Sequence, residues 1–594
     1  MARIASANND AMFSISKWLG VNENPDGDTA LKMGEAAEMR NFRITQDGHL
    51  QKRPGTKTVV ELGAECMGLW TGYVGEDEVT LAAAGGKVWL LDIPGGMKTE
   101  IGAVEPGERV HFFGFSEKVY ILDGKEYRSW DGETYAAVEG YRPLVSVAVE
   151  PTGGGTALEG VNKLCGLRRA QFSPDGTATV FQLPETGISS VDYVKNAVTG
   201  EAMQYTADLA AGTVTFSSAP PRGVSSIEIG WTYPVNYREN VTKMRFSEIF
   251  NGEQDSRVFL YGDGTNEAIY SGLDYDGKAT AEYFPDLNEM AVGEANTPIT
   301  GMIRQYSRLI VFKTSSAWAV GYSTLTLPDG TVTAGFYLTP VNRIIGNLSP
   351  GQVQLVTNYP RTLHGGGVYE WKNGSNGMTS DERQAQRISA RIEATLAEFD
   401  LSRCVTFDNE YKQDYYIVCG DTAVIHNYAV DAWFIYTAFP AAAFTMYRNE
   451  LYIGTADGRI CHVSREYMSD DGEAIDAFWR SGSMDFGQEW RRKFSTLIFV
   501  VMKPENGGRV TVTARSDRKA VYTERVIAAS LATFSKVNFA HFSFNTNRRS
   551  QVERLKIKVK NFALYQLVFH SNSASERNTI ESVDFRLRYS GFVK

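Results

Sequence analysis

Two similar stretches decide the fold class, GGKVWLLDI at Gly85–Ile93 and SEKVYILDG at Ser116–Gly124. In each stretch a polar turn precedes a Lys, a Val, an aromatic residue, two aliphatic residues and an Asp. β-branched and aromatic residues between turns are typical of short strands. The pattern returns in YSRLIVFKT at Tyr306–Thr314 and in RNELYIGTADG at Arg448–Gly458. Short strands that recur in groups every ~30–50 residues are typical of propeller blades, so the sequence predicts an all-β chain with an irregular β-propeller.

The blade pattern is interrupted twice, and the interruptions divide the chain. Residues 144–237 contain strand-like runs separated by Gly and Pro, as in GTVTFSSAPPRG, which predicts an inserted β-sandwich. Residues 476–594 contain longer alternating runs, which predict a C-terminal β-sandwich. We therefore assign residues 61–143 and 238–475 to the propeller, and residues 1–60 to an N-terminal hairpin segment used for assembly.

The run KIKVKNF in the last of these regions alternates strictly. It places Ile557 and Val559 on one face of a strand and Lys556, Lys558 and Lys560 on the other. Lysines on the solvent face protect an edge strand from accidental pairing.

Few helices are expected, and one segment has a clear helical pattern, TSDERQAQRISARIEATLAEFDL at Thr379–Leu401. Its apolar stripe consists of Ile388, Ile392, Leu396 and Phe399. Its basic residues recur every fourth position at Arg383, Arg387 and Arg391. Such a basic row is either a solvated face or a face toward a neighbouring subunit.

The composition limits the classes of function. Among 594 residues, 60 Lys and Arg face 70 Asp and Glu, for a net charge of −10. Without a long run of one sign, this balance argues against a broad basic face that grips nucleic acid. The five Cys are dispersed, which predicts reduced, buried thiols rather than a disulfide framework. We expect neither a signal peptide nor a membrane anchor, because the apolar runs are too short.

Signatures of catalysis and metal binding are missing from the sequence. No HExxH motif or GxSxG elbow occurs, and the seven His include no pair at metal-ligand spacing. We interpret SPDGTAT at Ser173–Thr179 and DYDGKATAEYFPD at Asp274–Asp286 as solvated turns rather than an Asp-box or a calcium loop. The run GGGTALEG at Gly153–Gly160 lacks the Lys-Ser/Thr ending of a phosphate-binding loop. We predict no catalytic, cofactor-binding or metal-binding residues, although carboxylates that meet only in the fold leave an enzyme as an alternative.

The segment MRNFRITQDGHLQKRPGTKTVV at Met39–Val60 carries two turn signals. Asp47-Gly48 predicts a hairpin, and Arg53-Pro54-Gly55 predicts a type II turn. Together with the residues before it, this segment resembles the start of β-propeller tail proteins of tailed bacteriophages. The group includes the podovirus tail nozzle, or tail tubular protein B, and the DNA-stabilisation proteins. The resemblance rests on Gly34–Ala37, Asn41-Phe42, Gly48-His49-Leu50 and Arg53-Pro54-Gly55, and later on GTVTFSSAPPRG and QDYYIVCGDTAVIHNYAVDAWFIY.

The resemblance implies a structural protein of the virion tail, made in the cytoplasm of the host bacterium. Six copies would form a ring that continues the DNA channel, retains packaged DNA and releases it on infection. Its partners would be a tail adaptor protein and tail fibre or tail-tip proteins, and it would enclose viral DNA without tight binding. Candidate constricting loops are GGGTALEG and NGSNGMTSDE. The alternatives are a tail-tip or baseplate component, and a propeller that binds or cleaves glycans at the host surface.

Overall fold

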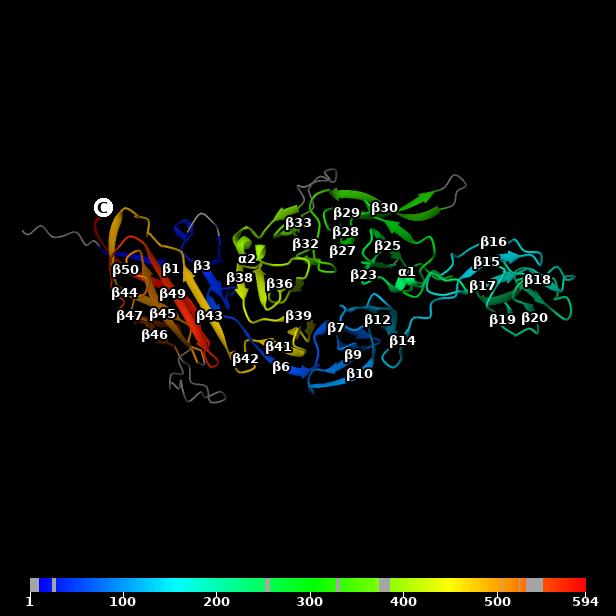
Figure 1. Ribbon diagram of the computed structural model, residues 1–594, viewed down its shortest axis with the longest axis horizontal. Helices are drawn as coiled ribbons and strands as arrows, with labels where there is room; N and C mark the ends of the chain where they lie inside the picture. The colour runs from blue at the N-terminus through cyan, green and yellow to red at the C-terminus, as the bar shows by residue number, and fades with distance from the viewer. Residues whose placement is uncertain are drawn as a thin grey trace, which may run out of the picture.

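The computed structural model describes residues 10–23, 28–251, 257–326, 332–372, 385–505, 507–522, 524–529 and 549–593. Its three β bodies follow one another along the long axis of the molecule (Figure 1). A terminal sandwich lies at one end, the propeller in the middle, and an inserted sandwich at the other end. The all-β class, with a propeller and two sandwiches, is confirmed.

The propeller consists of seven four-stranded antiparallel blades. Blade 1 has β7 (Cys66–Val74), β8 (Asp77–Ala84), β9 (Lys87–Asp92) and β10 (Met97–Ala103); blade 2 has β11 (His111–Phe115), β12 (Lys118–Leu122), β13 (Tyr127–Trp130) and β14 (Tyr135–Ala137). Blade 3 has β23 (Phe246–Phe250), β24 (Arg257–Tyr261), β25 (Glu267–Tyr270) and β26 (Glu289–Ala291); blade 4 has β27 (Ile299–Gln305), β28 (Arg308–Lys313), β29 (Ala317–Thr326) and β30 (Val332–Asn342).

The remaining blades follow in chain order. Blade 5 has β31 (Gln354–Val356), β32 (Tyr359–His364), β33 (Gly367–Trp371) and β34 (Ala385–Arg387); blade 6 has β35 (Val405–Asn409), β36 (Asp414–Cys419), β37 (Thr422–Asn427) and β38 (Ala432–Tyr436). Blade 7 has β39 (Ala441–Tyr447), β40 (Glu450–Thr455), β41 (Arg459–Ser464) and, as its fourth strand, β6 (Gly55–Glu61).

The ring is closed by a strand from the N-terminal region. The first strand of each blade contacts the first strand of the next, and β39 contacts β7 to complete the circle. Strand β6 pairs antiparallel with β41 on the outer side of blade 7. The last blade therefore combines strands from both ends of the propeller sequence, which joins the ring without a covalent link.

Tight two-residue turns connect many strands within the blades. Ser116 and Glu117 have φ angles of 45° and 67°, and Arg448 and Asn449 have φ angles of 49° and 65°. Positive φ at both central residues matches the right-handed twist of the flanking strands. The two stretches that decide the fold class become β9 and β12, and each follows such a turn.

The inserted sandwich interrupts the chain between blades 2 and 3. Its sheets consist of β16 (Thr156–Ala157), β15 (Leu144–Val149), β17 (Leu167–Phe172), β22 (Ile227–Thr232) and β19 (Ser190–Asn196), facing β18 (Val180–Gln182), β21 (Thr213–Thr215) and β20 (Thr206–Asp208). A core of its own, which includes Phe172, Phe181 and Trp231, lies between the sheets. A short helix α1 (Glu239–Thr242) leads from the insert into blade 3.

The terminal sandwich combines the two ends of the chain. One sheet contains β4 (Phe42–Ile44), β5 (Leu50–Lys52), β50 (Thr579–Phe592), β44 (Arg491–Met502), β47 (Gln551–Leu555), β48 (Val559–Phe562) and β1 (Asp10–Ile15). The other contains β2 (Gly20–Val21), β3 (Glu35–Arg40), β43 (Glu473–Ser481), β49 (Tyr565–Ser573), β45 (Arg509–Ser516) and β46 (Arg525–Ala528). A 3-10 turn η1 (Asp28–Ala30) lies between β2 and β3.

Residues 1–60 were expected to form a separate hairpin segment, and the structure places their described part differently. Trp18, Met39 and Phe42 are buried in the same core as Trp479 and Phe569 of the C-terminal region. The strands before Arg53 belong to the terminal sandwich, and β6 belongs to the propeller. A hairpin alone cannot bury these large apolar side chains. The N-terminal strands therefore pack into the terminal sandwich.

The expected long helix over Thr379–Leu401 is wrong for its described part. Residues 385–387 form strand β34, followed by a 3-10 turn η3 (Ala390–Ile392) and a short helix α2 (Glu393–Ala397). Ile392 and Leu396 are buried as the apolar stripe required, but Ile392 belongs to η3 and Leu396 to α2. Pairing of β34 with β33 completes a blade, and this outweighs the helical preference of its residues. Among the described residues, no helix is long and apolar enough to cross a membrane.

Candidate functional site: the junction of the propeller and the terminal sandwich

The segment that carries the family resemblance crosses from one body to another. Strand β5 lies in the terminal sandwich, and β6 lies in blade 7, so the turn at Arg53-Pro54-Gly55 spans the junction. Strand β42 (Ser469–Asp470) continues the sheet from blade 7 to β43, because Asp470 pairs with Thr56 of β6. The junction is therefore one continuous sheet, and the side chains around it decide how firmly the two bodies are joined.

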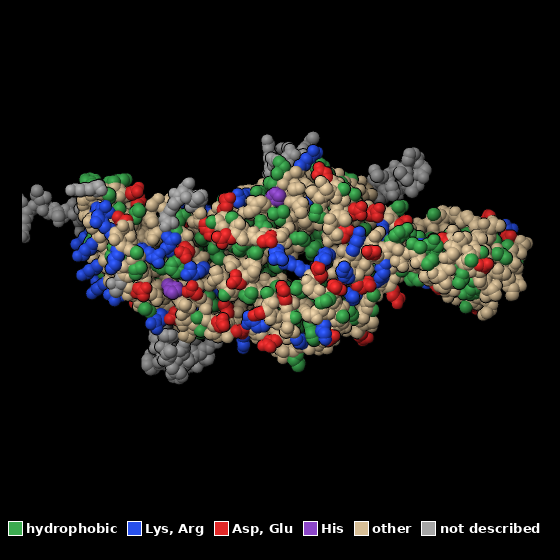
Figure 2. Space-filling model, viewed as in Figure 1, with side chains coloured by type: hydrophobic (Ala, Val, Ile, Leu, Met, Phe, Trp, Pro, Cys, Tyr) green, Lys and Arg blue, Asp and Glu red, His purple; other side chains and the backbone are tan. Residues whose placement is uncertain are grey.

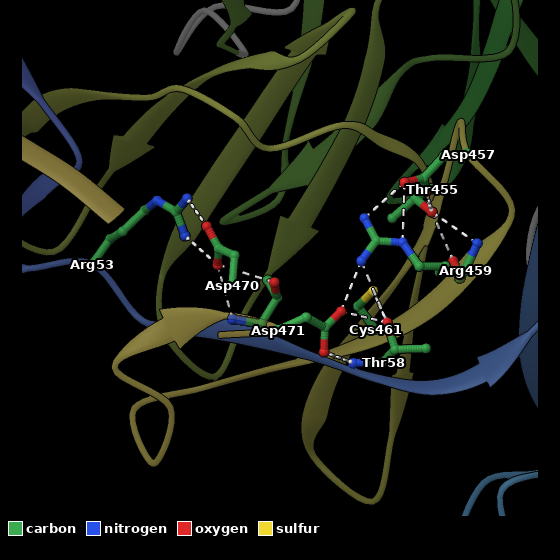
Figure 3. A network of polar contacts seen from close by, with 9 residues as sticks. Arg53, Thr58, Thr455, Asp457, Arg459, Cys461, Asp470 and Asp471 are labelled. Atoms are coloured by element: carbon green, nitrogen blue, oxygen red, sulfur yellow. Dashed lines mark hydrogen bonds and ion pairs between the residues drawn. The ribbon is translucent and has the colours of Figure 1, made fainter. Parts of the chain in front are cut away.

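Arg53 is the central cation of this junction (Figure 3). Its side chain is only 1% exposed, and its Nη1 and Nη2 atoms donate to the two carboxylate oxygens of Asp470 at 3.1 and 2.5 Å. The same guanidinium donates to the backbone carbonyls of Pro54 and Thr437. A bidentate pair with further hydrogen bonds fixes the geometry of both partners.

Asn41, which follows β3 of the terminal sandwich, joins Arg53 to blade 6. We call the contacts of Asn41, Arg53 and Asp470 the lock. Its φ of 56° is left-handed, a conformation that Asn tolerates better than most residues. Its Oδ1 accepts hydrogen bonds from Nε of Arg53 and from the backbone N–H of Thr437, both at 2.9 Å. Its Nδ2 donates to Oγ1 of Thr437 at 2.8 Å and to the carbonyl of Asp476 at 2.9 Å. One side chain thus connects blade 6, β43 and the turn before β6.

A second group of contacts continues along β6 (Figure 3). Asp471 accepts hydrogen bonds from the backbone N–H and the hydroxyl of Thr58, and Nη1 of Arg459 donates to it at 2.7 Å. Burial acts to raise the pKa of Asp471, but these contacts outweigh it and lower the pKa. Hydrogen bonds from Arg459 likewise lower the pKa of Asp457. Both carboxylates therefore stay ionised at neutral pH and are poor proton donors.

A pocket of about 500 Å³ opens beside these residues. Its acidic lining consists of Asp421, Asp457, Asp470, Asp471 and Glu473, and Arg459 also lines it. Three of the acids are held by guanidinium groups. Within the described ranges, no group of His, Cys, Asp and Glu has the arrangement of a metal site. The arrangement suits a mechanical joint between two bodies.

The turns singled out in the sequence stay apart from this junction. Asp175 accepts hydrogen bonds from the backbone N–H groups of Thr177 and Ala178, as in a solvated turn. Asp274 does the same for Asp276 and Lys278. The five thiols are free, and burial raises the pKa of Cys66 to about 12 and that of Cys461 to about 11.

The two candidate loops and the basic row have separate locations. In GGGTALEG, Thr156 and Ala157 form edge strand β16, and the carboxylate of Glu159 accepts a hydrogen bond from the N–H of Leu144, so the run is held against β15. The run NGSNGMTSDE, together with Arg383, lies outside the described residues. Arg387 pairs with Glu393 at 3.1 Å, and Arg391 contacts Asp431 at 3.8 Å.

The basic character of residues 476–594 was not predicted from the sequence. Residues 476–594 contain 21 Lys and Arg but only 10 Asp and Glu, whereas the rest of the chain is strongly acidic. Counting charge by region rather than looking for runs of one sign detects this difference. Lys and Arg side chains accordingly gather at the end of the molecule formed by β44, β47 and β50 (Figure 2).

No family model and no curated protein matches the sequence. Among solved structures, the computationally designed protein Ika8 aligns with 68% of this chain and 99% of its own at 10% identity, with a TM-score of 0.32. A chain of the mitotic checkpoint complex aligns with 69% of this chain and 95% of its own at 6% identity and a TM-score of 0.33. Exo-β-1,3-galactanase from Phanerochaete chrysosporium covers 82% of this chain and 96% of its own at 8% identity and a TM-score of 0.17. Similarities this weak carry no argument about function.

Proposed function

We propose that this chain is a structural subunit of a bacteriophage tail. Copies of it form a ring, or nozzle, that continues the DNA channel, retains packaged DNA and releases it on infection. The observation that carries the proposal is the position of the motif that resembles tail proteins. Its polar residues Asn41 and Arg53 are buried and serve to lock two bodies together, which is a structural role and not a catalytic one.

A rigid joint suits a ring subunit. The angle between the propeller and the terminal sandwich must be the same in every copy if the ring is to close. The buried ion pair of Arg53 and Asp470 and the hydrogen bonds of Asn41 fix that angle. The inserted sandwich, with its own core, extends from the other end of the propeller (Figure 1), and its Gly153–Gly160 edge is one of the two candidate constrictions, the other being NGSNGMTSDE.

The acidic balance of the chain before residue 476 favours passage of DNA over retention by contact. Residues 1–475 contain 39 Lys and Arg against 60 Asp and Glu. A lumen with this balance repels phosphate, so that DNA slides through without binding to the wall. DNA is then held by a closed constriction and not by charge.

The test is the composition of the virion. Quantitative mass spectrometry of purified particles is expected to find the chain in a fixed copy number, six by the resemblance, and electron microscopy is expected to place it in the tail. Absence of the chain from purified particles overturns the proposal. Cleavage or binding of host surface glycans by the isolated chain would instead support the glycan-directed alternative.

A further inference from the structure

The outer face of the seven-stranded sheet carries a group of exposed and half-exposed cations. In the edge strand formed by β47 and β48, Leu555, Ile557 and Val559 are buried, while the residues between them point to solvent. We define the cationic face by Arg554, Lys556, Lys558 and Lys560 of this edge and by Arg586 and Arg588 of β50. No ion pair joins any of the first four to an acid within the described part of the chain.

An apolar stripe lies between the two rows of cations. Strand β44 separates the edge from β50. Its Phe499 pairs in register with Arg554 of the edge and with Asp584 of β50, so one acid borders the stripe on the β50 side. Leu497 pairs with Arg586, and Phe494 pairs with both Lys560 and Arg588.

These three apolar side chains of β44 are only partly buried, and two exposed residues extend the stripe at its sides. Val552 is 61% exposed on the edge strand, and Met12 is 60% exposed on β1. An apolar centre bordered by charge is the usual anatomy of a protein-binding surface. The stripe combines the aromatic Phe494 and Phe499 with the aliphatic Leu497, Val552 and Met12. The acidic surface described below, which complements the cations, favours a protein over a nucleic acid as its occupant.

The propeller carries a matching surface of opposite sign. Three turns of blades 1 and 2 lie side by side, since the N–H of Gly75 donates to the carbonyl of Glu117 at 3.1 Å and Gly132 lies against Val74. We define the acidic turn patch by the exposed side chains Glu76, Asp77, Glu78, Glu117, Asp131 and Glu133.

Tyr73 supplies an apolar contact beside these acids, because its side chain is 66% exposed. None of the six acids forms an ion pair with a described Lys or Arg. An aromatic ring bordered by unpaired carboxylates complements an apolar stripe bordered by cations.

These two surfaces cannot meet within one chain. The sheet that contains β44 and β50 forms one end of the molecule, and blades 1 and 2 lie beyond the middle (Figure 1). A symmetric contact between two cationic faces would place cations opposite cations, which is repulsive. We propose that the cationic face of one copy binds the acidic turn patch of a second copy of this chain.

This inference deepens the proposed ring by naming the contact between its subunits, and it rests on that proposal only for closure of the ring. A contact between two different surfaces is heterologous, and repeated copies of it give either a closed ring or an open filament. Because opposite charges provide much of the complementarity, assembly is expected to weaken as salt rises.

The first experiment measures self-association of the full chain by sedimentation velocity at about 50 and about 500 mM salt. Parent protein is expected to form a larger species at low salt and to dissociate at high salt. The triple variant Lys556→Glu, Lys558→Glu, Lys560→Glu is expected to raise the dissociation constant at least ~10-fold. The matched control is Lys57→Glu, Lys125→Glu, Lys278→Glu, which changes the net charge equally at exposed lysines elsewhere and is expected to assemble like the parent.

The second experiment mixes two reversed proteins. Neither the Lys556/Lys558/Lys560 variant nor a Glu76→Lys, Asp77→Lys, Glu78→Lys variant is expected to assemble alone, because each then presents two surfaces of the same sign. Their mixture restores both complementary contacts and is expected to assemble in equal proportions. A parent chain that stays monomeric at low salt, or a mixture that does not assemble, overturns the inference. Neither result touches the proposed tail function, which fails only if purified virions lack the chain.

Discussion

Nε of Arg53 donates a hydrogen bond to Oδ1 of Asn41 at 2.9 Å, and both side chains are buried. Through this contact the end of β3 is fixed to the turn that begins β6, so the chain enters the propeller at a set angle. The guanidinium then pairs with Asp470, which lies on the strand that leaves blade 7. The entry and the exit of the propeller are thus held by one side chain.

Substitution Arg53→Ala is expected to lower the free energy of unfolding by about 3–5 kcal/mol, because it leaves Asp470 without its cation. Arg53→Lys keeps the charge but loses the bidentate geometry, so an intermediate loss is expected. Urea unfolding followed by circular dichroism measures both effects. Arg222→Ala, at an exposed residue of the insert, is the control; equal losses in control and Arg53 variants would contradict the role of the lock.

Two N-terminal deletions are expected to separate the roles of this region. Removal of residues 1–53 takes away the buried side chains Trp18 and Phe42 together with strands β1 to β5 but leaves β6, so the propeller should stay folded while the sandwich opens. Removal of residues 1–61 also takes away the outer strand of blade 7 and should destabilise the propeller itself. Limited proteolysis with mass spectrometry identifies which body becomes sensitive. If both deletions leave the propeller equally resistant, closure by β6 is unimportant.

Asn162 is expected to hold the insert against blade 3. Its Nδ2 donates to the carbonyls of Tyr141 and Glu282, and its Oδ1 accepts hydrogen bonds from the N–H groups of Leu164 and Phe284. Asn162→Ala leaves these buried groups without partners, at a cost of about 1–3 kcal/mol. Hydrogen exchange should increase at the edge where the insert meets blade 3 and stay unchanged in the insert core. Uniform exchange across the whole insert would instead indicate that its core has unfolded.

The stability of the propeller is expected to depend on pH through Asp408 and Glu248. Burial, together with the charge of Glu410, raises the pKa of Asp408 to about 7, and burial raises the pKa of Glu248 to about 7. Since the folded pKa lies above the unfolded one, each group destabilises the fold as pH rises from about 4 to about 7.

The variants Asp408→Asn and Glu248→Gln should therefore gain stability relative to the parent as pH increases through this window. Unfolding titrations at several pH values measure the difference between each variant and the parent. A difference that stays constant with pH would rule out these groups as its source.

The sequence alone determined the elements that depend on neighbours in the chain. Alternation with a period of two and the two-residue turns identified the blade strands, and the Gly- and Pro-rich runs identified the insert. The lysines of KIKVKNF were assigned to the solvent face, because the buried Ile557 and Val559 fix the alternation. The helix over Thr379–Leu401 failed because pairing of β34 in blade 5 decided the conformation there.

How distant segments combine depends on long-range pairing, which local sequence patterns do not reveal. The pairs that close the ring and lock the junction join residues about 400 positions apart, such as Asn41 with Thr437 and Arg53 with Asp470. Local periodicity contains no information about such partners, because the alternation of apolar and polar residues in a strand is the same whichever strand it pairs with. The same holds for the cationic face, where register across β47, β44 and β50 gathers cations that the sequence scatters over 35 positions between Arg554 and Arg588. Sequence therefore set which residues form strands and which face of each strand is buried, while pairing over long distances set which faces are joined.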